Sequence, residues 1–115
     1  MKKIRLLLVS YGPRGKIWAK AIKKNSKTEL VGICDINKKL KDKNSKNIIF
    51  FHELDSALSY LKPDAVILST PPFNRMKDLK ICSKFKLPIL VEKPLTIDLE
   101  EAKRQISFMN RHKLL

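Results

Sequence analysis

Five short runs of mainly apolar residues, at 4–9, 29–34, 47–51, 65–69 and 88–91, constrain the fold of this chain more than any other feature. The runs do not alternate regularly between apolar and polar residues. A strand with this pattern is buried on both faces, which is typical of a parallel sheet covered by helices. The intervening and final segments have apolar residues at helical spacing or a turn signal before them, and predict helices at 14–25, 38–42, 54–61, 74–85 and 99–111.

This alternation of strands and helices predicts the topology. Because crossovers between parallel strands are right-handed, we expect a doubly wound α/β Rossmann fold with strand order 3-2-1-4-5. We expect a single domain over residues 1–115, since no stretch rich in Gly, Ser or Pro divides the chain. Residues 38–46 are polar nearly throughout, so this segment is either a short helix or one turn followed by a loop.

Composition excludes several classes of protein. No apolar run approaches the roughly 20 residues that cross a bilayer, and no small-residue cleavage site follows the apolar N-terminal stretch. Cys34, Cys82, His52 and His112 lack further ligands at metal-binding spacing. We therefore expect a cytoplasmic protein with reduced, buried cysteines, no membrane partner and no metal site.

The net charge of +14 raises the alternative of a nucleic-acid-binding protein. Most of the basic residues are lysines scattered over the predicted helices, without a row of aromatic residues for base stacking. We expect a solvated, lysine-rich surface and no nucleic-acid partner. Such a surface attracts an anionic dinucleotide, whereas DNA affinity that falls steeply with salt would favour the alternative.

The turn after the first strand has the sequence Ser10-Tyr11-Gly12-Pro13-Arg14-Gly15. It follows the dinucleotide-binding pattern G-x-G-x-x-G, with Ser10 in the place of the first glycine. Gly12 lets the backbone approach a pyrophosphate, Gly15 lets the helix pack closely, and the helix N-terminus supplies free amides. Ser10 either adopts the backbone conformation of the missing glycine or holds the loop with its hydroxyl.

Asp35 ends the second predicted strand, twenty residues beyond Gly15. A carboxylate at this spacing accepts hydrogen bonds from the ribose hydroxyls of an adenosine and repels a 2′-phosphate, so NAD is favoured over NADP. Lys38 and Lys39 could weaken that preference. An alternative role for Asp35 is to cap the short helix after it.

Two further loops leave the ends of strands. The fourth strand is followed by Ser69-Thr70-Pro71-Pro72-Phe73-Asn74, in which the paired prolines hold an extended loop and Asn74 is a candidate helix cap. The fifth strand is followed by Glu92-Lys93-Pro94. Ligands bind at the carboxyl ends of strands in such sheets, so Lys93 is the candidate catalytic residue.

Together these segments resemble the N-terminal domain of the Gfo/Idh/MocA (glucose-fructose oxidoreductase, inositol dehydrogenase and rhizopine catabolism) family over nearly the whole chain. The resemblance rests on the glycine turn with Trp18 and Ala21 behind it, Leu30-Val31-Gly32-Ile33-Cys34-Asp35, Lys62-Pro63-Asp64-Ala65-Val66, Thr70-Pro71-Pro72, and Leu90-Val91-Glu92-Lys93-Pro94-Leu95 followed by Glu100-Glu101-Ala102. The motifs Thr70-Pro71-Pro72 and Glu92-Lys93-Pro94 are the most specific of these.

The resemblance implies hydride transfer between a nicotinamide and a sugar, sugar-nucleotide or cyclitol substrate. Lys93 would polarise the substrate oxygen and assist proton transfer, and Glu92 would help to seat the nicotinamide. The predicted cofactor-binding residues are Ser10, Tyr11, Gly12, Pro13, Arg14, Gly15, Asp35, Ile36, Ser69, Thr70, Pro71, Asn74, Glu92 and Lys93.

Two departures from the family qualify these implications. Arg75 stands where the family commonly has histidine, which puts cofactor contacts of that loop in doubt. The family's second domain, which binds substrate and completes catalysis, has no counterpart in residues 1–115. We therefore expect an NAD(P)-binding domain that is inactive alone, or alternatively a stand-alone nucleotide-sensing or regulatory module.

Overall fold

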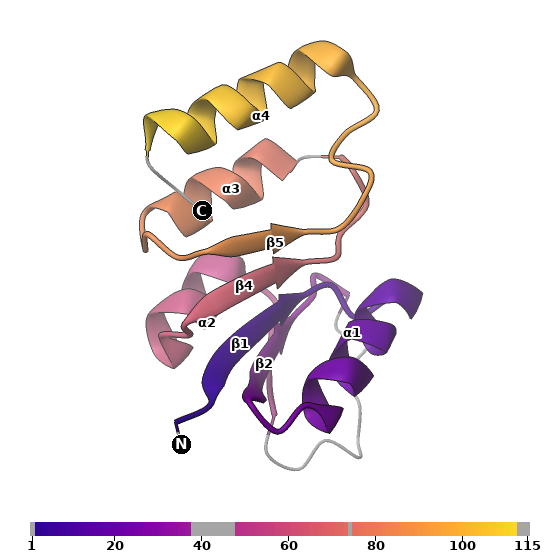
Figure 1. Cartoon of the computed structure of the whole chain (residues 1–115), viewed down its shortest axis with the longest axis vertical. Coiled ribbons are helices and arrows are strands. Elements are labelled where there is room, and N and C mark those ends of the chain that lie inside the picture. Colours follow the sequence, from indigo (N-terminus) through magenta and orange to yellow (C-terminus); the bar gives the residue numbers. More distant parts are fainter. Residues whose placement is uncertain (1, 38–47, 74, 113–115) are drawn as a thin grey trace.

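The computed structural model, which describes residues 2–37, 48–73 and 75–112, contains a five-stranded, all-parallel sheet (Figure 1). The strands are β1 (Ile4–Val9), β2 (Thr28–Cys34), β3 (Ile49–Phe51), β4 (Ala65–Leu68) and β5 (Ile89–Val91), and the helices are α1 (Pro13–Lys24), α2 (Leu54–Leu61), α3 (Arg75–Ser83) and α4 (Leu99–Arg111). The strand order is β3-β2-β1-β4-β5, so the predicted doubly wound topology is confirmed.

The central strands β1, β2 and β4 are buried on both faces because their side chains alternate between two hydrophobic clusters, whereas the edge strands β3 and β5 leave Ile49 and Leu90 exposed. In β1, Leu7 and Val9 belong to one cluster and Leu8 to the other. Helices α2, α3 and α4 contribute to the first cluster, for example through Leu79 and Phe108, whereas α1 packs on the opposite face. This double burial explains why the sequence of β1 is apolar almost throughout.

Most predicted boundaries are accurate to within two residues. The helices at 54–61 and 99–111 are confirmed as predicted, and α1 begins one residue early, with Pro13 in its first turn. Helix α3 ends at Ser83, before the predicted end at 85, because the following turn leads to a left-handed Lys86 with φ of 52°. The predicted helix at 38–42 lies outside the described residues.

No helix within the described part of the chain combines the length and apolar character needed to cross a bilayer. The two cysteines, Cys34 and Cys82, are free and buried, as predicted. Burial in the apolar core, with a smaller contribution from nearby Asp78, raises the pKa of each thiol to about 12.

The carboxyl ends of the strands, called here the carboxyl edge, are joined by hydrogen bonds that continue past the strands themselves. The backbone N–H of Ser10 donates to the Cys34 carbonyl (2.7 Å), that of Ser69 to Val9 (3.0 Å), and that of Glu92 to Leu68 (2.9 Å). The loops that follow β1, β4 and β5 therefore begin side by side. The predicted site residues that the structure describes lie on these loops, in the first turn of α1 and immediately after β2.

Candidate functional site

The turn from β1 to α1 depends on an unusual backbone conformation at Ser10. Its φ is 83°, in the left-handed region that glycine adopts most readily. Ser10 therefore adopts the backbone conformation of the missing glycine, which is the first of the two predicted possibilities. The carbonyl of Ser10 also accepts a hydrogen bond from the Ser69 hydroxyl at 3.2 Å, which ties the turn to the end of β4.

Gly15 lies in the first turn of α1 and is buried against this turn. A Cβ atom at this position would overlap the Ser10 carbonyl oxygen and would lie 3.2 Å from the Ser69 hydroxyl oxygen. Only glycine lets α1 approach the turn so closely, which is the packing role predicted for Gly15.

Gly12 differs from Gly15 because nothing in the surrounding structure requires a glycine there. Its φ is −73°, and the nearest atom to an added Cβ would be the Ser10 hydroxyl oxygen, 3.9 Å away. A side chain at Gly12 would instead fill space in front of α1. The glycine therefore keeps the N-terminus of α1 accessible.

No side chain among the described residues caps the N-terminus of α1, and its first turn contains no acidic residue. In α4, by contrast, the Asp98 carboxylate accepts a hydrogen bond from the Glu100 N–H at 2.9 Å, and Glu100 and Glu101 occupy the first turn. Free amides and the positive end of the helix dipole therefore make the start of α1 a suitable place for an anion.

Asp35 joins the ends of β1 and β2. One carboxylate oxygen accepts a hydrogen bond from the Tyr11 N–H at 2.7 Å, and the other accepts from the Asn37 N–H at 2.8 Å. The second contact resembles the capping alternative, although the helix predicted at 38–42 lies outside the described residues. The next residue, Ile36, has 89% of its surface exposed.

The Tyr11 ring belongs to the hydrophobic core, where it packs edge-on against Phe50 with 5.7 Å between ring centroids. Lys16 Nζ lies 5.7 Å from the centre of the same ring. Tyr11 thus supports the turn through its side chain and contacts Asp35 through its backbone.

The loop after β4 contains three predicted contact residues that the structure describes. The buried Ser69 hydroxyl donates to the Val9 carbonyl at 2.8 Å, so it braces the sheet. The Thr70 hydroxyl oxygen is buried and has no hydrogen-bond partner among the described residues, while Pro71 is exposed. Asn74 lies outside the described residues.

Glu92 connects the end of β5 to α1 across the carboxyl edge. One oxygen of its carboxylate accepts from Arg14 Nε at 2.9 Å and from Trp18 Nε1 at 2.7 Å. The other accepts from the Lys93 N–H at 3.2 Å. The hydrogen bonds from Arg14 and Trp18 lower the pKa of Glu92 from its ordinary value, so the carboxylate is ionised at neutral pH.

Sequence reasoning did not pair Glu92 with Arg14 and Trp18. Trp18 was part of the family resemblance without an assigned role. Because a partly buried indole N–H needs an acceptor, the sequence could indicate that Trp18 has a hydrogen-bond partner. The sequence could not show which carboxylate would supply the acceptor.

Arg75 is the second residue whose role was missed. It has only 1% of its surface exposed, at the start of α3. Its guanidinium donates to the carbonyls of Thr70 (2.6 Å), Pro94 (2.7 Å) and Leu95 (3.0 Å). The loop after β4 is therefore fixed to the loop after β5 by this side chain.

Lys93, the candidate catalytic residue, is exposed directly beyond β5. Its peptide bond to Pro94 is cis. It follows Glu92, which binds α1, and precedes Pro94, whose carbonyl binds Arg75. Lys93 therefore lies on a turn that is held on both sides.

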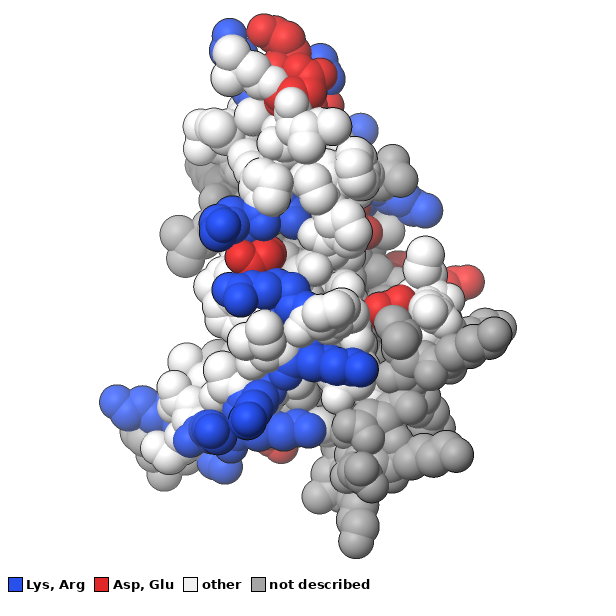
Figure 2. Space-filling view, turned by 90° about the vertical axis from the view of Figure 1, so that its right-hand side faces the viewer, with Lys and Arg blue, Asp and Glu red and all other residues white. Residues whose placement is uncertain are grey.

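The side of the molecule that carries α1 is strongly basic. Figure 2 shows Lys and Arg side chains spread over the lower half of this side, at the height of α1 in Figure 1. The helix has the sequence PRGKIWAKAIKK, which contains five basic residues and no acidic one. This charge favours the approach of an anionic ligand to the carboxyl edge.

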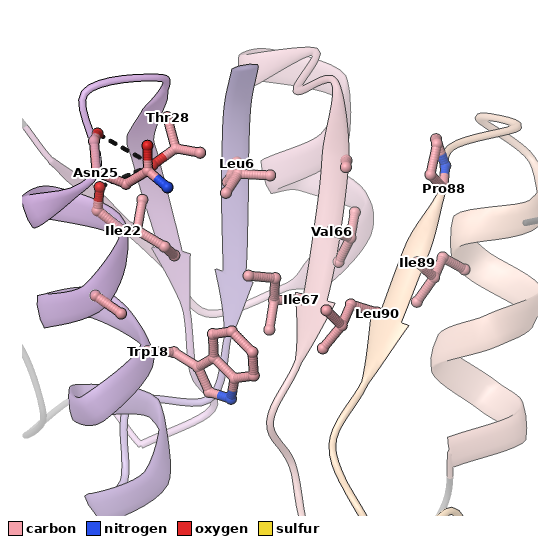
Figure 3. A pocket seen from close by; sticks show the side chains of 12 residues that line it. Leu6, Trp18, Ile22, Asn25, Thr28, Val66, Ile67, Pro88, Ile89 and Leu90 are labelled. Atoms are coloured by element: carbon pink, nitrogen blue, oxygen red, sulfur yellow. Dashed lines mark hydrogen bonds between the residues drawn. The ribbon is translucent and has the colours of Figure 1, made fainter. Parts of the chain in front are cut away.

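A separate groove of about 410 Å³ lies between α1 and β5 on one face of the sheet (Figure 3). Its lining includes Trp18 and Ile22 from α1 and Leu6, Ile67 and Leu90 from the strands. None of the described residues that line it is charged, so these residues offer nothing to balance the charge of a pyrophosphate. The predicted cofactor residues lie instead at the carboxyl edge.

Comparisons with known proteins agree with this geometry. The sequence profile of the oxidoreductase family with an NAD-binding Rossmann fold (GFO_IDH_MocA) matches residues 4–115. No curated protein matches the sequence significantly.

Among solved structures, the WlbA dehydrogenase from Bordetella pertussis in complex with NADH and UDP-GlcNAcA is 26% identical, with a TM-score of 0.87 over 98% of this chain and 34% of that chain. Scyllo-inositol dehydrogenase from Lactobacillus casei with bound NAD(H) and scyllo-inositol is 22% identical, with a TM-score of 0.86 over 97% of this chain and 34% of that chain. The crystal structure of a putative NADPH-dependent oxidoreductase from Desulfitobacterium hafniense is 20% identical, with a TM-score of 0.87 over 98% of this chain and 33% of that chain.

This chain therefore spans about a third of the length of the solved structures that it matches. The match at residues 4–115, the strand order and the glycine turn lead to one assignment. The chain belongs to the Gfo/Idh/MocA family of oxidoreductases and forms its NAD-binding Rossmann domain.

Proposed function

We propose that this chain binds NAD(H) along its carboxyl edge, as the dinucleotide-binding part of an oxidoreductase acting on a sugar, sugar nucleotide or cyclitol. The observation that carries the proposal is the uncapped N-terminus of α1 beside the Asp35 carboxylate, which is bonded to the same turn through the Tyr11 N–H. An anion site and a hydroxyl acceptor are thereby fixed next to each other.

The pyrophosphate binds at the N-terminus of α1, where Gly12 leaves room and the first-turn amides are free to donate. Asp35 accepts the ribose hydroxyls of the adenosine, since each carboxylate oxygen can accept more than the one hydrogen bond described for it. The exposed Ile36 offers an apolar surface to the adenine. A negative charge at Asp35 favours NAD over NADP.

The nicotinamide half of the cofactor extends toward the loops after β4 and β5, where Thr70, Pro71, Glu92 and Lys93 lie. The bound nicotinamide supplies the hydride acceptor or donor. Lys93 orients and polarises the substrate oxygen, and its ammonium stabilises a developing alkoxide. Glu92 keeps this turn in place through Arg14 and Trp18.

We expect substrate recognition to require residues outside the third of these relatives that this chain matches. The WlbA dehydrogenase and the inositol dehydrogenase both extend over about three times the matched length, since the match covers 34% of each. We therefore expect the 115 residues to bind the cofactor without turning over a substrate.

Calorimetric titration with NADH and NADPH tests the proposal. Wild-type protein should bind NADH more tightly, and Asp35→Ser should weaken NADH binding by roughly tenfold to a hundredfold while reducing the preference over NADPH, because charge-assisted hydrogen bonds to the ribose are lost. The ratio of the two affinities is the deciding quantity, since general destabilisation does not change it.

Asp64→Ser is the matched control. The Asp64 carboxylate also accepts a backbone hydrogen bond, from the Arg5 N–H at 2.8 Å, but near the opposite end of β1. It should leave both affinities unchanged. Failure of wild-type protein to bind either dinucleotide at millimolar concentration would contradict the proposed function.

A further inference from the structure

Arg75 has an environment that is unusual for an arginine. Its side chain is almost fully buried, yet the three acceptors described for its guanidinium are neutral backbone carbonyls. Burial lowers its pKa, while Asp78 and Glu92 act in the opposite direction. Burying a charged group away from water is unfavourable unless it is well hydrogen-bonded. A buried arginine of this kind therefore indicates that the loops to which it binds must be held in a specific arrangement.

The three carbonyls belong to the two loops that surround Lys93. Thr70 follows β4, and Pro94 and Leu95 follow β5. Figure 1 shows these loops side by side at the ends of their strands, with the start of α3 next to them. A single guanidinium, with its planar set of donors, thus fixes the distance between the loops.

We propose that Arg75 is a positioning residue that shapes the nicotinamide half of the dinucleotide site. This inference rests on the proposed function. Through Pro94 and Leu95 it holds the turn that carries Lys93, and through Thr70 it holds the loop opposite. The buried Thr70 hydroxyl oxygen, which has no partner among the described residues, lies on the segment held by Arg75 and is available to a ligand.

This role distinguishes Arg75 from Asp35 and the turn at Ser10. Those residues lie at β1 and β2, where the adenosine and pyrophosphate are proposed to bind, whereas the hydrogen bonds described for Arg75 all go to the loops after β4 and β5. Weakening the Arg75 contacts should therefore affect the nicotinamide end selectively. A residue that only stabilises the fold would affect both ends of the cofactor alike.

The test compares two ligands, NADH and ADP-ribose, which lacks the nicotinamide. Arg75→Lys keeps the charge and the apolar stem but places all its donors on one nitrogen, so it cannot reproduce the planar set of donors with which Arg75 binds the two loops. We expect its affinity for NADH to fall by about tenfold, as expected from the loss of one or two charge-assisted hydrogen bonds, and its affinity for ADP-ribose to change less than twofold. Arg75→Met, measured at a temperature where circular dichroism shows it folded, should give a larger NADH loss with the same selectivity.

Gln105→Met is the control for removing a buried polar side chain. Gln105 also has 1% of its surface exposed, but it lies on α4 and its described hydrogen bond is to Glu101. It should change neither affinity.

The possible outcomes separate the two proposals. Equal losses for NADH and ADP-ribose in Arg75→Lys, or no loss for either, would overturn the positioning role while the dinucleotide site stands. Equal affinity of wild-type protein for the two ligands would also overturn it, because the nicotinamide would then contribute nothing. Wild-type protein that binds neither ligand would overturn the proposed function and the positioning role together.

Discussion

The two halves of the carboxyl edge are stabilised in different ways. The β1–β2 half, formed by residues 10–15 and 35–36, depends on backbone geometry: a left-handed Ser10 and the close contact of Gly15 with it. The β4–β5 half, formed by residues 69–71 and 92–95, depends on charged side chains: Arg75 binds its two loops to each other, and Glu92 joins it to α1. Adding a single methyl group should therefore destabilise the β1–β2 half, whereas removing a charge should destabilise the β4–β5 half.

The largest expected effect comes from Gly15→Ala in the β1–β2 half. The new Cβ would overlap a backbone oxygen of Ser10, which cannot rotate away as a side chain can. We expect the free energy of unfolding to decrease by about 3 kcal/mol, the upper part of the usual range for overpacking. Urea denaturation followed by circular dichroism measures this loss.

Gly12→Ala is the matched control, because its Cβ would have no neighbour closer than 3.9 Å. We expect its free energy of unfolding to change by less than about 0.5 kcal/mol, while its affinity for NADH falls. If Gly15→Ala were as stable as Gly12→Ala, the account of the β1–β2 half would be wrong.

This contrast also explains how much of the molecule could be predicted from sequence. The apolar runs predicted the strands of the sheet, because burial leaves a local pattern in a strand, and the right-handed crossovers between parallel strands predicted their order. The packing role of Gly15 could also be predicted from a local pattern, since Gly15 lies only five residues from Ser10, which it contacts. The left-handed conformation was one of two stated possibilities for Ser10.

The contacts that hold the β4–β5 half could not be predicted in the same way. Glu92 and Arg14 are 78 residues apart, and Arg75 and Pro94 are 19 apart on different elements. Many Lys, Arg and Glu side chains occur in this sequence, and nothing local distinguishes those that pair. Arg75 was noted only as a departure from the family, and its three carbonyl contacts depend on the completed fold.

Glu92→Gln tests the charge dependence of the β4–β5 half. Hydrogen bonds from Arg14 and Trp18 lower the pKa of Glu92 below its ordinary value of 4.5. A carboxyl whose pKa is lower in the folded state stabilises the protein above the unfolded pKa, and this contribution is lost as pH falls through the folded pKa. Wild-type protein should therefore have a higher Tm than Glu92→Gln by a few degrees at pH 7, and the difference should shrink as the pH falls below about 4.

Glu101→Gln provides the control, because Glu101 also binds an arginine, with Arg104 Nε at 2.9 Å, but within a single helix. A pair within one exposed helix contributes little to stability. Its effect on Tm should be smaller than that of Glu92→Gln. Equal changes in Tm would show that the hydrogen bonds by which Glu92 joins β5 to α1 stabilise the protein no more than an ion pair within one helix.

The smallest expected effect comes from restoring glycine at position 10. The left-handed conformation costs a non-glycine residue about 1–2 kcal/mol. Glycine avoids this cost, but the greater conformational freedom that it loses on folding costs about 0.5–1 kcal/mol. Ser10→Gly should therefore increase the free energy of unfolding by up to about 1.5 kcal/mol, measured by urea denaturation. Ser10→Ala removes the same hydroxyl without relieving the backbone, so it should be less stable than Ser10→Gly. If the two variants were equally stable, the conformation with φ of 83° would not limit the stability of this turn, and the hydroxyl would have to account for the presence of serine there.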